Sequence, residues 1–133
     1  MRKDNNDTYQ GSQDPLTAKI IEACFNVHNK LGPGFIERIY VNALKIALKE
    51  LNLQYIEEKG FTVKYENQNV GKFRVDFLIE DKVIVEIKAI EGKKPKIFES
   101  QVISYLKASG LKVGLLVNFG NRKCEVRRLM INK

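Results

Sequence analysis

Apolar residues recur with a helical period in the first part of the chain. Asp14 and Pro15 form a typical helix start, an N-cap followed by proline at the first helical position. Apolar positions three and four residues apart follow as far as the breaker Gly32-Pro33-Gly34. A second helical pattern then begins, and its apolar side is broad enough to predict deep packing against a sheet. That side comprises Phe35, Ile36, Ile39, Tyr40, Ala43, Leu44, Ala47, Leu48 and Leu51.

From Gln54 onward the apolar positions alternate with a period of two, which is typical of strands. The first strand is predicted over 55–65, with an interruption at Gly60 where a bulge would fit. The later elements are a turn over 66–69, strands over 73–79 and 83–89, a helix over 97–109 stopped by Gly110, a buried strand over 112–118 and an exposed edge strand over 124–131. The predicted order is ααβββαββ, an α/β fold in which helices flank a central mixed sheet.

Charged residues in the middle of two Val-, Ile- and Phe-rich strands are the most unusual feature of the sequence. Asp76 lies in the first of these strands, and Glu86 and Lys88 lie in the second. Joining the apolar faces pairs Val75 with Ile87, Phe77 with Val85 and Ile79 with Val83. This register places Asp76 opposite Glu86, with Lys88 on the same face, and it requires the three-residue loop 80–82.

Burying such charges is costly unless they pair with one another or bind a cation. Metal-assisted chemistry is therefore the leading interpretation of the three charged side chains. A buried structural network in a protein-interaction domain is an alternative, and it predicts no effect of metal ions on stability.

The charge of the chain favours an anionic partner. The 133 residues include 23 Lys and Arg against 16 Asp and Glu, a formal net charge of +7. This excess suits nucleic acid, although an ordinary basic surface would carry the same charge. The length suits a single domain, which we expect over 14–133 after a polar, disordered tail over 1–13.

The sequence also predicts where in the cell the protein is located. No apolar run is long enough to span a bilayer and the N-terminus has no apolar signal region, so we expect a cytoplasmic protein without a membrane partner. Cys24, Cys124 and the single His28 form neither a disulfide framework nor a zinc site. The two cysteines are interpreted as reduced, structural thiols.

Glu37 adds a fourth charged candidate, in the first turn of the second predicted helix. Taken alone, it is explained by a favourable interaction with the helix dipole. The spacing Gly34-x-x-Glu37-x-x-Tyr40 points further, because it matches the signature of the GxxExxY protein family of the PD-(D/E)XK nuclease superfamily. The chain resembles this family from about Leu16 to its C-terminus. The resemblance includes the segments 27–34, 74–76, 83–89 and 105–111, together with Gln101 and Tyr105.

The resemblance implies a restriction-endonuclease-like core and a nuclease that depends on Mg²⁺ or Mn²⁺. Asp76 and Glu86 would bind the metal, together with Glu37 and the backbone carbonyl of Ile87. Lys88 would orient the attacking water, help to deprotonate it and offset charge in the transition state. DNA is the expected substrate, with RNA not excluded, and self-association or a partner protein could supply specificity.

Several further residues are candidates at the edge of the active site or on the nucleic-acid path. Each has a structural alternative: a tyrosine packed on the sheet beside a solvated glutamine, a histidine at a helix C-terminus, and lysines in a solvated loop. The candidates are Tyr40, Gln101, Tyr105, His28, Lys93, Lys94 and Lys96. A second basic stretch at 122–128 is interpreted as protection of an edge strand.

The function predicted from the sequence is therefore a divalent-metal-dependent phosphodiesterase acting on DNA. The alternative is a nuclease-fold module that binds nucleic acid or serves as an accessory without turnover.

Overall fold

A computed structural model describes residues 14–132; the predicted tail over 1–13 lies outside the described residues. The order of elements is ααβββαββ, as predicted. The elements are α1 (Pro15–Leu31), α2 (Glu37–Glu50), β1 (Tyr55–Tyr65), β2 (Gln68–Ile79), β3 (Val83–Lys88), α3 (Ile97–Ser109), β4 (Val113–Asn118) and β5 (Glu125–Met130). None of the helices within this part of the chain is long and apolar enough to cross a membrane.

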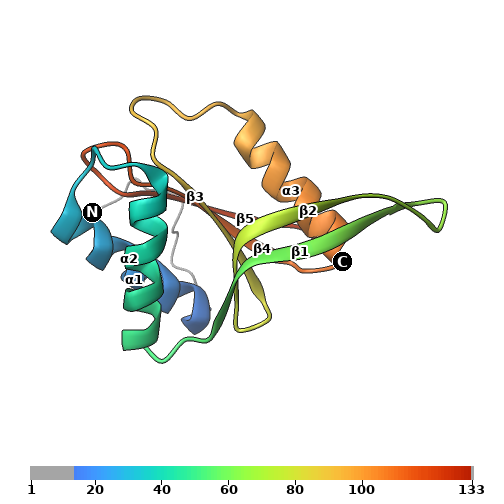
Figure 1. The fold of residues 1–133 in the computed structure, drawn as a ribbon, viewed down its shortest axis with the longest axis horizontal. Coiled ribbons are helices and arrows are strands. Elements are labelled where there is room, and N and C mark those ends of the chain that lie inside the picture. The colour runs from blue at the N-terminus through green and yellow to red at the C-terminus, as the bar shows by residue number, and fades with distance from the viewer. Residues whose placement is uncertain (1–13, 133) are drawn as a thin grey trace.

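The five strands form one mixed sheet in the order β1-β2-β3-β4-β5 (Figure 1). The β3–β4 pair is parallel and is connected through α3, whereas the other three pairs are antiparallel. This arrangement confirms the predicted mixed α/β fold with helices against a central sheet.

The helices cover both faces of the sheet and create two separate apolar clusters. On one face, α1 and α2 pack against Phe77, Val85 and Leu115 in the larger cluster. On the other face, Val102 and Leu106 of α3 pack against Ile84 and Leu116. Strands β3 and β4 are therefore buried on both sides, which explains why their sequences are almost continuously apolar.

The helix boundaries follow from local sequence chemistry. The Asp14 side chain accepts a hydrogen bond from the Leu16 N–H at 3.0 Å, so it caps α1 as predicted. Gly110 ends α3 in the left-handed conformation that glycine adopts without strain. The broad apolar side predicted for α2 is only partly correct. Tyr40, Leu44 and Leu48 are buried, but Phe35, Ile36 and Ile39, just before and within the first turn of the helix, are exposed.

The register of the β2–β3 hairpin agrees with the prediction over three pairs, Phe77–Val85, Leu78–Ile84 and Ile79–Val83. The loop is the predicted 80–82, and Glu80 and Asp81 both adopt positive φ. Pairing does not continue to Val75 and Ile87 as predicted. Val75 packs on the α3 face, whereas Phe77 packs on the opposite face, so β2 changes face around Asp76.

The predicted interruption of β1 at Gly60 is wrong, because Gly60 pairs regularly with Arg74. The irregularities lie on either side. Glu58, opposite Asp76, has a φ of 54° and is left out of the ladder, and the register shifts between Val63 and Lys64. Glycine is tolerated in an ordinary strand conformation, so its presence alone did not mark the bulge.

Candidate active site

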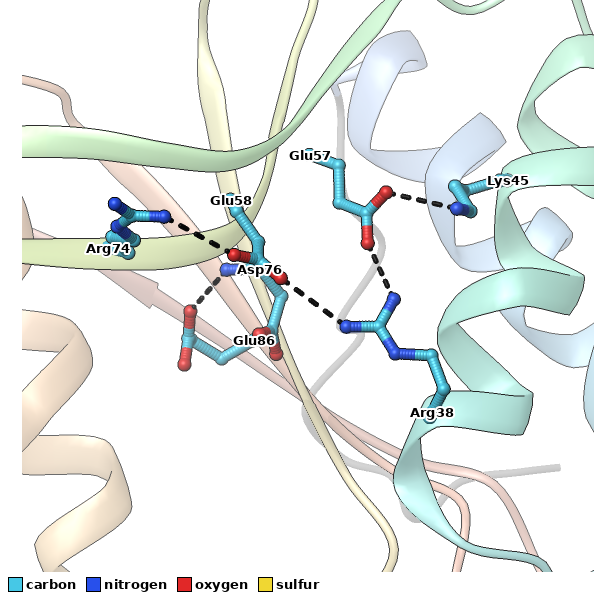
Figure 2. A network of polar contacts seen from close by, with 7 residues as sticks. All are labelled: Arg38, Lys45, Glu57, Glu58, Arg74, Asp76 and Glu86. Atoms are coloured by element: carbon cyan, nitrogen blue, oxygen red, sulfur yellow. Dashed lines mark hydrogen bonds and ion pairs between the residues drawn. The ribbon is translucent and has the colours of Figure 1, made fainter.

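Asp76 and Glu86 meet where β2 separates from β3. Past Phe77 the two strands are joined by side chains instead of ladder hydrogen bonds. The Asp76 N–H donates to Glu86 Oε2 at 2.8 Å, and the Ile87 N–H donates to Asp76 Oδ2 at 2.7 Å. Each carboxylate therefore satisfies a backbone donor of the neighbouring strand, which fixes both side chains side by side (Figure 2).

Burial perturbs these acids strongly. Glu86 is only 9% exposed, and burial, followed by the charge of Asp76, raises its pKa to about 7. The pKa of Asp76 is also raised by burial, although the Ile87 N–H and the nearby Lys88 and Arg38 act in the opposite direction. Raised pKa values on adjacent buried carboxyl groups show that their charged forms are poorly solvated, as is common at functional sites.

Glu37 belongs to the same electrostatic cluster, although its side chain lies on another element. It occupies the first turn of α2, where the helix dipole also favours it. Its pKa is raised by partial burial and by Asp76, and lowered by Lys88 and Arg38. The structure thus brings Glu37 close enough to Asp76 and Lys88 for their charges to act on its pKa.

Tyr40 explains the spacing of the signature around Glu37. The buried Tyr40 hydroxyl donates to the Gly32 carbonyl at 2.5 Å and accepts from the Phe35 N–H at 3.2 Å. Gly34, between these two contacts, has a φ of 110°, a conformation that favours glycine. Tyr40 therefore closes the loop that leads into α2, and Glu37 follows directly after this fixed loop.

Lys88 lies half-buried at the end of β3. Its Nζ sits 4.2 Å from the centroid of the Phe98 ring of α3, a cation–π contact. Among residues 14–132 it forms no ion pair within 4 Å, yet its charge acts on Asp76, Glu86 and Glu37. Phe98 thus holds the ammonium beside the carboxylates without neutralising it.

Strand β1 contributes charged residues that the sequence analysis did not single out. Glu58 lies opposite Asp76 and raises its pKa, and Arg38 of α2 bonds Glu57 at 2.6 Å and Glu58 at 3.3 Å (Figure 2). Arg74 also pairs with Glu58, at 3.4 Å. The signal that could have found Glu58 is its position opposite Asp76 when the β1–β2 hairpin is aligned.

A comparison of the sequence with known protein families shows the family of this chain. The family described as the PD-(D/E)XK nuclease superfamily matches residues 14–129. The chain belongs to the PD-(D/E)XK nuclease superfamily. The match covers most of the chain and includes every acid described above as well as Lys88. No curated protein matches the chain at a significant level.

A solved structure shares the nuclease-type fold. The structure titled "Crystal structure of SSO0001" aligns with a TM-score of 0.56 and 19% sequence identity. The alignment covers 72% of this chain and 50% of the other, so the present chain spans about half the length of that protein. At this level of identity the similarity shows the fold alone.

The donor set of this PD-(D/E)XK site suits a hard divalent cation. One oxygen of Asp76 and one of Glu86 are held by backbone N–H groups, and each carboxylate keeps a second oxygen that accepts no hydrogen bond from residues 14–132. Carboxylate oxygens are the ligands that Mg²⁺ and Mn²⁺ prefer. Within the described residues, however, three or more acidic, histidine or cysteine side chains are nowhere gathered into a ready metal-binding group.

Helix α3 places the two predicted edge residues differently. Gln101 is exposed to solvent. Tyr105 stacks on Phe73 of β2, with ring centroids 4.4 Å apart, so it packs on the sheet. Its pKa is nevertheless raised by burial and by the charges of Glu86 and Asp76, so it also borders the acidic cluster.

His28 has a structural environment. It is buried in the last turn of α1, and its Nε2 lies 2.8 Å from the Asn121 carbonyl oxygen. The histidine therefore connects α1 to the loop between β4 and β5. Cys24 and Cys124 are free thiols, and burial raises the pKa of Cys24 to about 12.

Two asparagines that the sequence analysis missed organise the loop after Lys88. The Asn118 side chain accepts from the Ile90 N–H at 2.8 Å and donates to the Ile90 carbonyl at 2.9 Å. Asn121 bonds both backbone groups of Gly92 in the same way, at 2.7 and 2.8 Å. The following lysines diverge: Lys93 and Lys96 are exposed, and Lys94 lies 3.8 Å from Glu125.

Proposed function

We propose that the chain is a divalent-metal-dependent nuclease that hydrolyses phosphodiester bonds of nucleic acid, with DNA as the substrate. The observation that carries the proposal is the pair Asp76 and Glu86, fixed side by side with Lys88 close enough to lower the pKa of both. Phosphodiester hydrolysis is assisted by a metal ion and positive charge beside the scissile phosphate. Two buried carboxylates, each with one oxygen available to a metal ion, lie here beside an ammonium group.

Each residue has a role that follows from its environment. Asp76 and Glu86 would hold Mg²⁺ or Mn²⁺, with Glu37 and the Ile87 carbonyl as further ligands. When bound, the ion would polarise the scissile phosphate and lower the pKa of a coordinated water. Lys88, held on the Phe98 ring, would orient the water and stabilise negative charge on the phosphate oxygens.

The test is a cleavage assay with the full chain on duplex, nicked, branched and single-stranded DNA, and on RNA. We expect cleavage with Mg²⁺ or Mn²⁺ and none with a chelator. Lys88→Ala should reduce the rate by about 100-fold or more, because it removes a preorganised charge. Lys112→Ala, at an exposed lysine, is the matched control and should keep the wild-type rate. Equal background rates in wild type and Lys88→Ala would refute the proposal.

One observation favours a second candidate, a nuclease-fold module that binds nucleic acid without turnover. Asp76 and Glu86 each commit an oxygen to a backbone N–H, and the described residues hold no preassembled metal group. This candidate predicts salt-dependent DNA binding that survives Asp76→Ala, with no cleavage of any substrate in any metal.

We further propose that the chain belongs to the GxxExxY branch of the superfamily, supported by the way Tyr40 fixes the loop before Glu37. A cytoplasmic location remains part of the proposal, and so does a partner protein or self-association that supplies specificity.

A further inference from the structure

The β1–β2 hairpin extends well past the rest of the sheet as a two-stranded ribbon. Strand β2 pairs with β3 only at Phe77–Ile79, so its residues 68–75 pair with β1 alone. Figure 1 shows this ribbon pointing away from α1 and α2 and extending past α3, with its end at the Glu66-Asn67 turn. A two-stranded ribbon with little core of its own is only marginally stable in water. The length of this ribbon therefore indicates that it has a function.

The two faces of the ribbon are chemically different. Phe61 and Phe73 lie on one face and pack against α3, where Phe73 stacks on Tyr105. The pairs Gly60–Arg74, Thr62–Lys72 and Lys64–Asn69 alternate with this aromatic face and lie on the other side. We call Thr62, Lys64, Lys72 and Arg74 the basic ribbon face; all four side chains are exposed.

The basic ribbon face carries uncompensated charge. Within residues 14–132, neither Lys64 nor Lys72 forms an ion pair, and Arg74 shares only Glu58 while its side chain stays 72% exposed. A hollow of about 340 Å³ is lined by Glu58, Lys72 and Arg74, by Gly60 and Thr62, and by Phe61 and Phe73. Glu58, which lines this hollow, lies opposite Asp76, so the ribbon face ends next to the acidic cluster.

From these features we propose that the basic ribbon face binds the phosphate backbone of double-stranded nucleic acid and leads it to the acidic site. The inference deepens the proposed nuclease function and rests on it. At about 3.3 Å per residue, the row from Asp76 to the Asn69 position beside Lys64 spans about 23 Å, or roughly seven phosphate steps of 3.4 Å along one strand of a duplex.

The chemistry of this face favours a duplex over a single strand. Proteins that hold single strands stack the bases on aromatic side chains. Here the aromatic rings at the base of the ribbon already stack on one another and on Tyr105 of α3. The basic ribbon face offers three cations and a hydroxyl, which are groups that contact phosphates and sugars.

The test measures binding by the full chain, in a chelator so that no cleavage occurs, over a series of salt concentrations. The ligands are a labelled duplex and the single strand of the same sequence. The double variant Lys64→Gln/Lys72→Gln should bind the duplex more weakly and lower the slope of log K against log salt by about two, since each substitution removes one lysine charge from a phosphate. The control Lys19→Gln/Lys49→Gln removes two exposed lysines from α1 and the last turn of α2 and should match the wild type.

Several outcomes would overturn the inference. These are an unchanged slope in the ribbon variant, an equal loss in the control, tighter wild-type binding to the single strand, or a change in oligomeric state caused by the ribbon substitutions. The outcomes also separate the two proposals. Metal-dependent cleavage with unaffected ribbon variants would refute the ribbon alone, whereas ribbon-dependent duplex binding without any cleavage would refute the nuclease activity alone.

Discussion

Glu86 is a carboxylate buried where an ionised group is poorly solvated. Its pKa of about 7 reflects burial first and the neighbouring Asp76 second, while the Asp76 N–H and Lys88 only partly compensate. Such a group adopts its charged form readily only if a cation joins it. The burial of Glu86 that favours metal binding should therefore lower the stability of the metal-free protein.

The buried charge of Glu86 predicts how the stability of the protein depends on pH when a chelator keeps it free of metal. The folded-state pKa of Glu86 lies above its ordinary value of 4.5, so between these values the folded state binds more protons than the unfolded state. The stability contributed by Glu86 therefore decreases as the pH rises from about 4.5 to 7, by up to about 3 kcal/mol. Glu86→Gln should match the wild type near pH 4 and be more stable above pH 7.

Chemical denaturation of wild type and Glu86→Gln at several pH values measures this difference. Glu22→Gln, which changes an exposed glutamate of α1, is the control and should show no such trend. A Glu86→Gln protein that is less stable than wild type at pH 8 would contradict the assignment of a destabilising buried charge.

Alternation along one hairpin, a local property of the sequence, predicted Asp76 opposite Glu86 with Lys88 on the same face. Asp76 and Glu86 do lie side by side, but the ladder register behind the prediction ends at Phe77 and side-chain hydrogen bonds join them instead. Glu58 and Asn118 were missed for different reasons. Glu58 lies near Asp76 only through the twisted β1–β2 pairing, and Asn118 ends an apolar run, so its contacts with Ile90 depend on a parallel pairing distant in sequence.

The loop between α1 and α2 is fixed by a side chain from the helix that follows it. Tyr40→Phe removes a buried hydroxyl that bonds the Gly32 carbonyl and the Phe35 N–H. We expect a decrease of about 1–2 kcal/mol in the free energy of unfolding, because two backbone groups are left without their partner. Urea denaturation of Tyr40→Phe beside Tyr65→Phe, whose ring is 69% exposed, measures it. Equal stabilities of the two variants would show that the hydroxyl does not hold the loop.

A second close contact joins the segments that follow β3 and β4. A Cβ atom on Gly120 would lie 2.4 Å from the backbone of Ile90, and backbone atoms cannot move aside as a flexible side chain can. Gly120→Ala should therefore destabilise the fold by about 1–3 kcal/mol or more. Gly71→Ala is the control, since its Cβ would meet nothing within 4 Å, and thermal unfolding of both variants tests the difference. Equal melting temperatures would contradict this close approach.

Secondary-structure elements were predicted correctly where the apolar residues are periodic. The predictions were wrong where tertiary packing determines the local structure or the burial of a residue. The α3 range of 97–109 and its stop at Gly110 are confirmed, because apolar spacing and a C-terminal glycine are local signals. The bulge predicted at Gly60 and the burial predicted for Ile36 failed. Gly60 pairs regularly with Arg74 and Ile36 is 69% exposed, and both outcomes depend on tertiary contacts that local spacing does not specify.

At the scale of the whole molecule, acids from three different elements come within electrostatic reach of one another. Glu37 comes from the start of α2, Asp76 from the middle of β2 and Glu86 from β3. The sheet order and the two helical layers bring them near one another. Burial raises the pKa of all three, and the charge of Asp76 raises the pKa of Glu37 and Glu86 further. The order of elements could be predicted from the sequence, but the divergence of β2 from β3 could not, since no residue pattern encodes it.

Metal binding should therefore stabilise the entire fold. A cation that binds only the folded state adds about 2.7 kcal/mol at 100 times its dissociation constant, which for a chain of this size raises the melting temperature by roughly 10 °C. We expect this rise with Mg²⁺ or Mn²⁺ in the wild type and its absence in Asp76→Asn, with Asp81→Asn, at an exposed loop position, as the control that keeps it. Thermal-shift measurements with Mg²⁺, Mn²⁺ and Ca²⁺ test this. A melting temperature unaffected by all three ions would instead favour a structural charge network, because such a network needs no cation to hold Asp76 and Glu86 together.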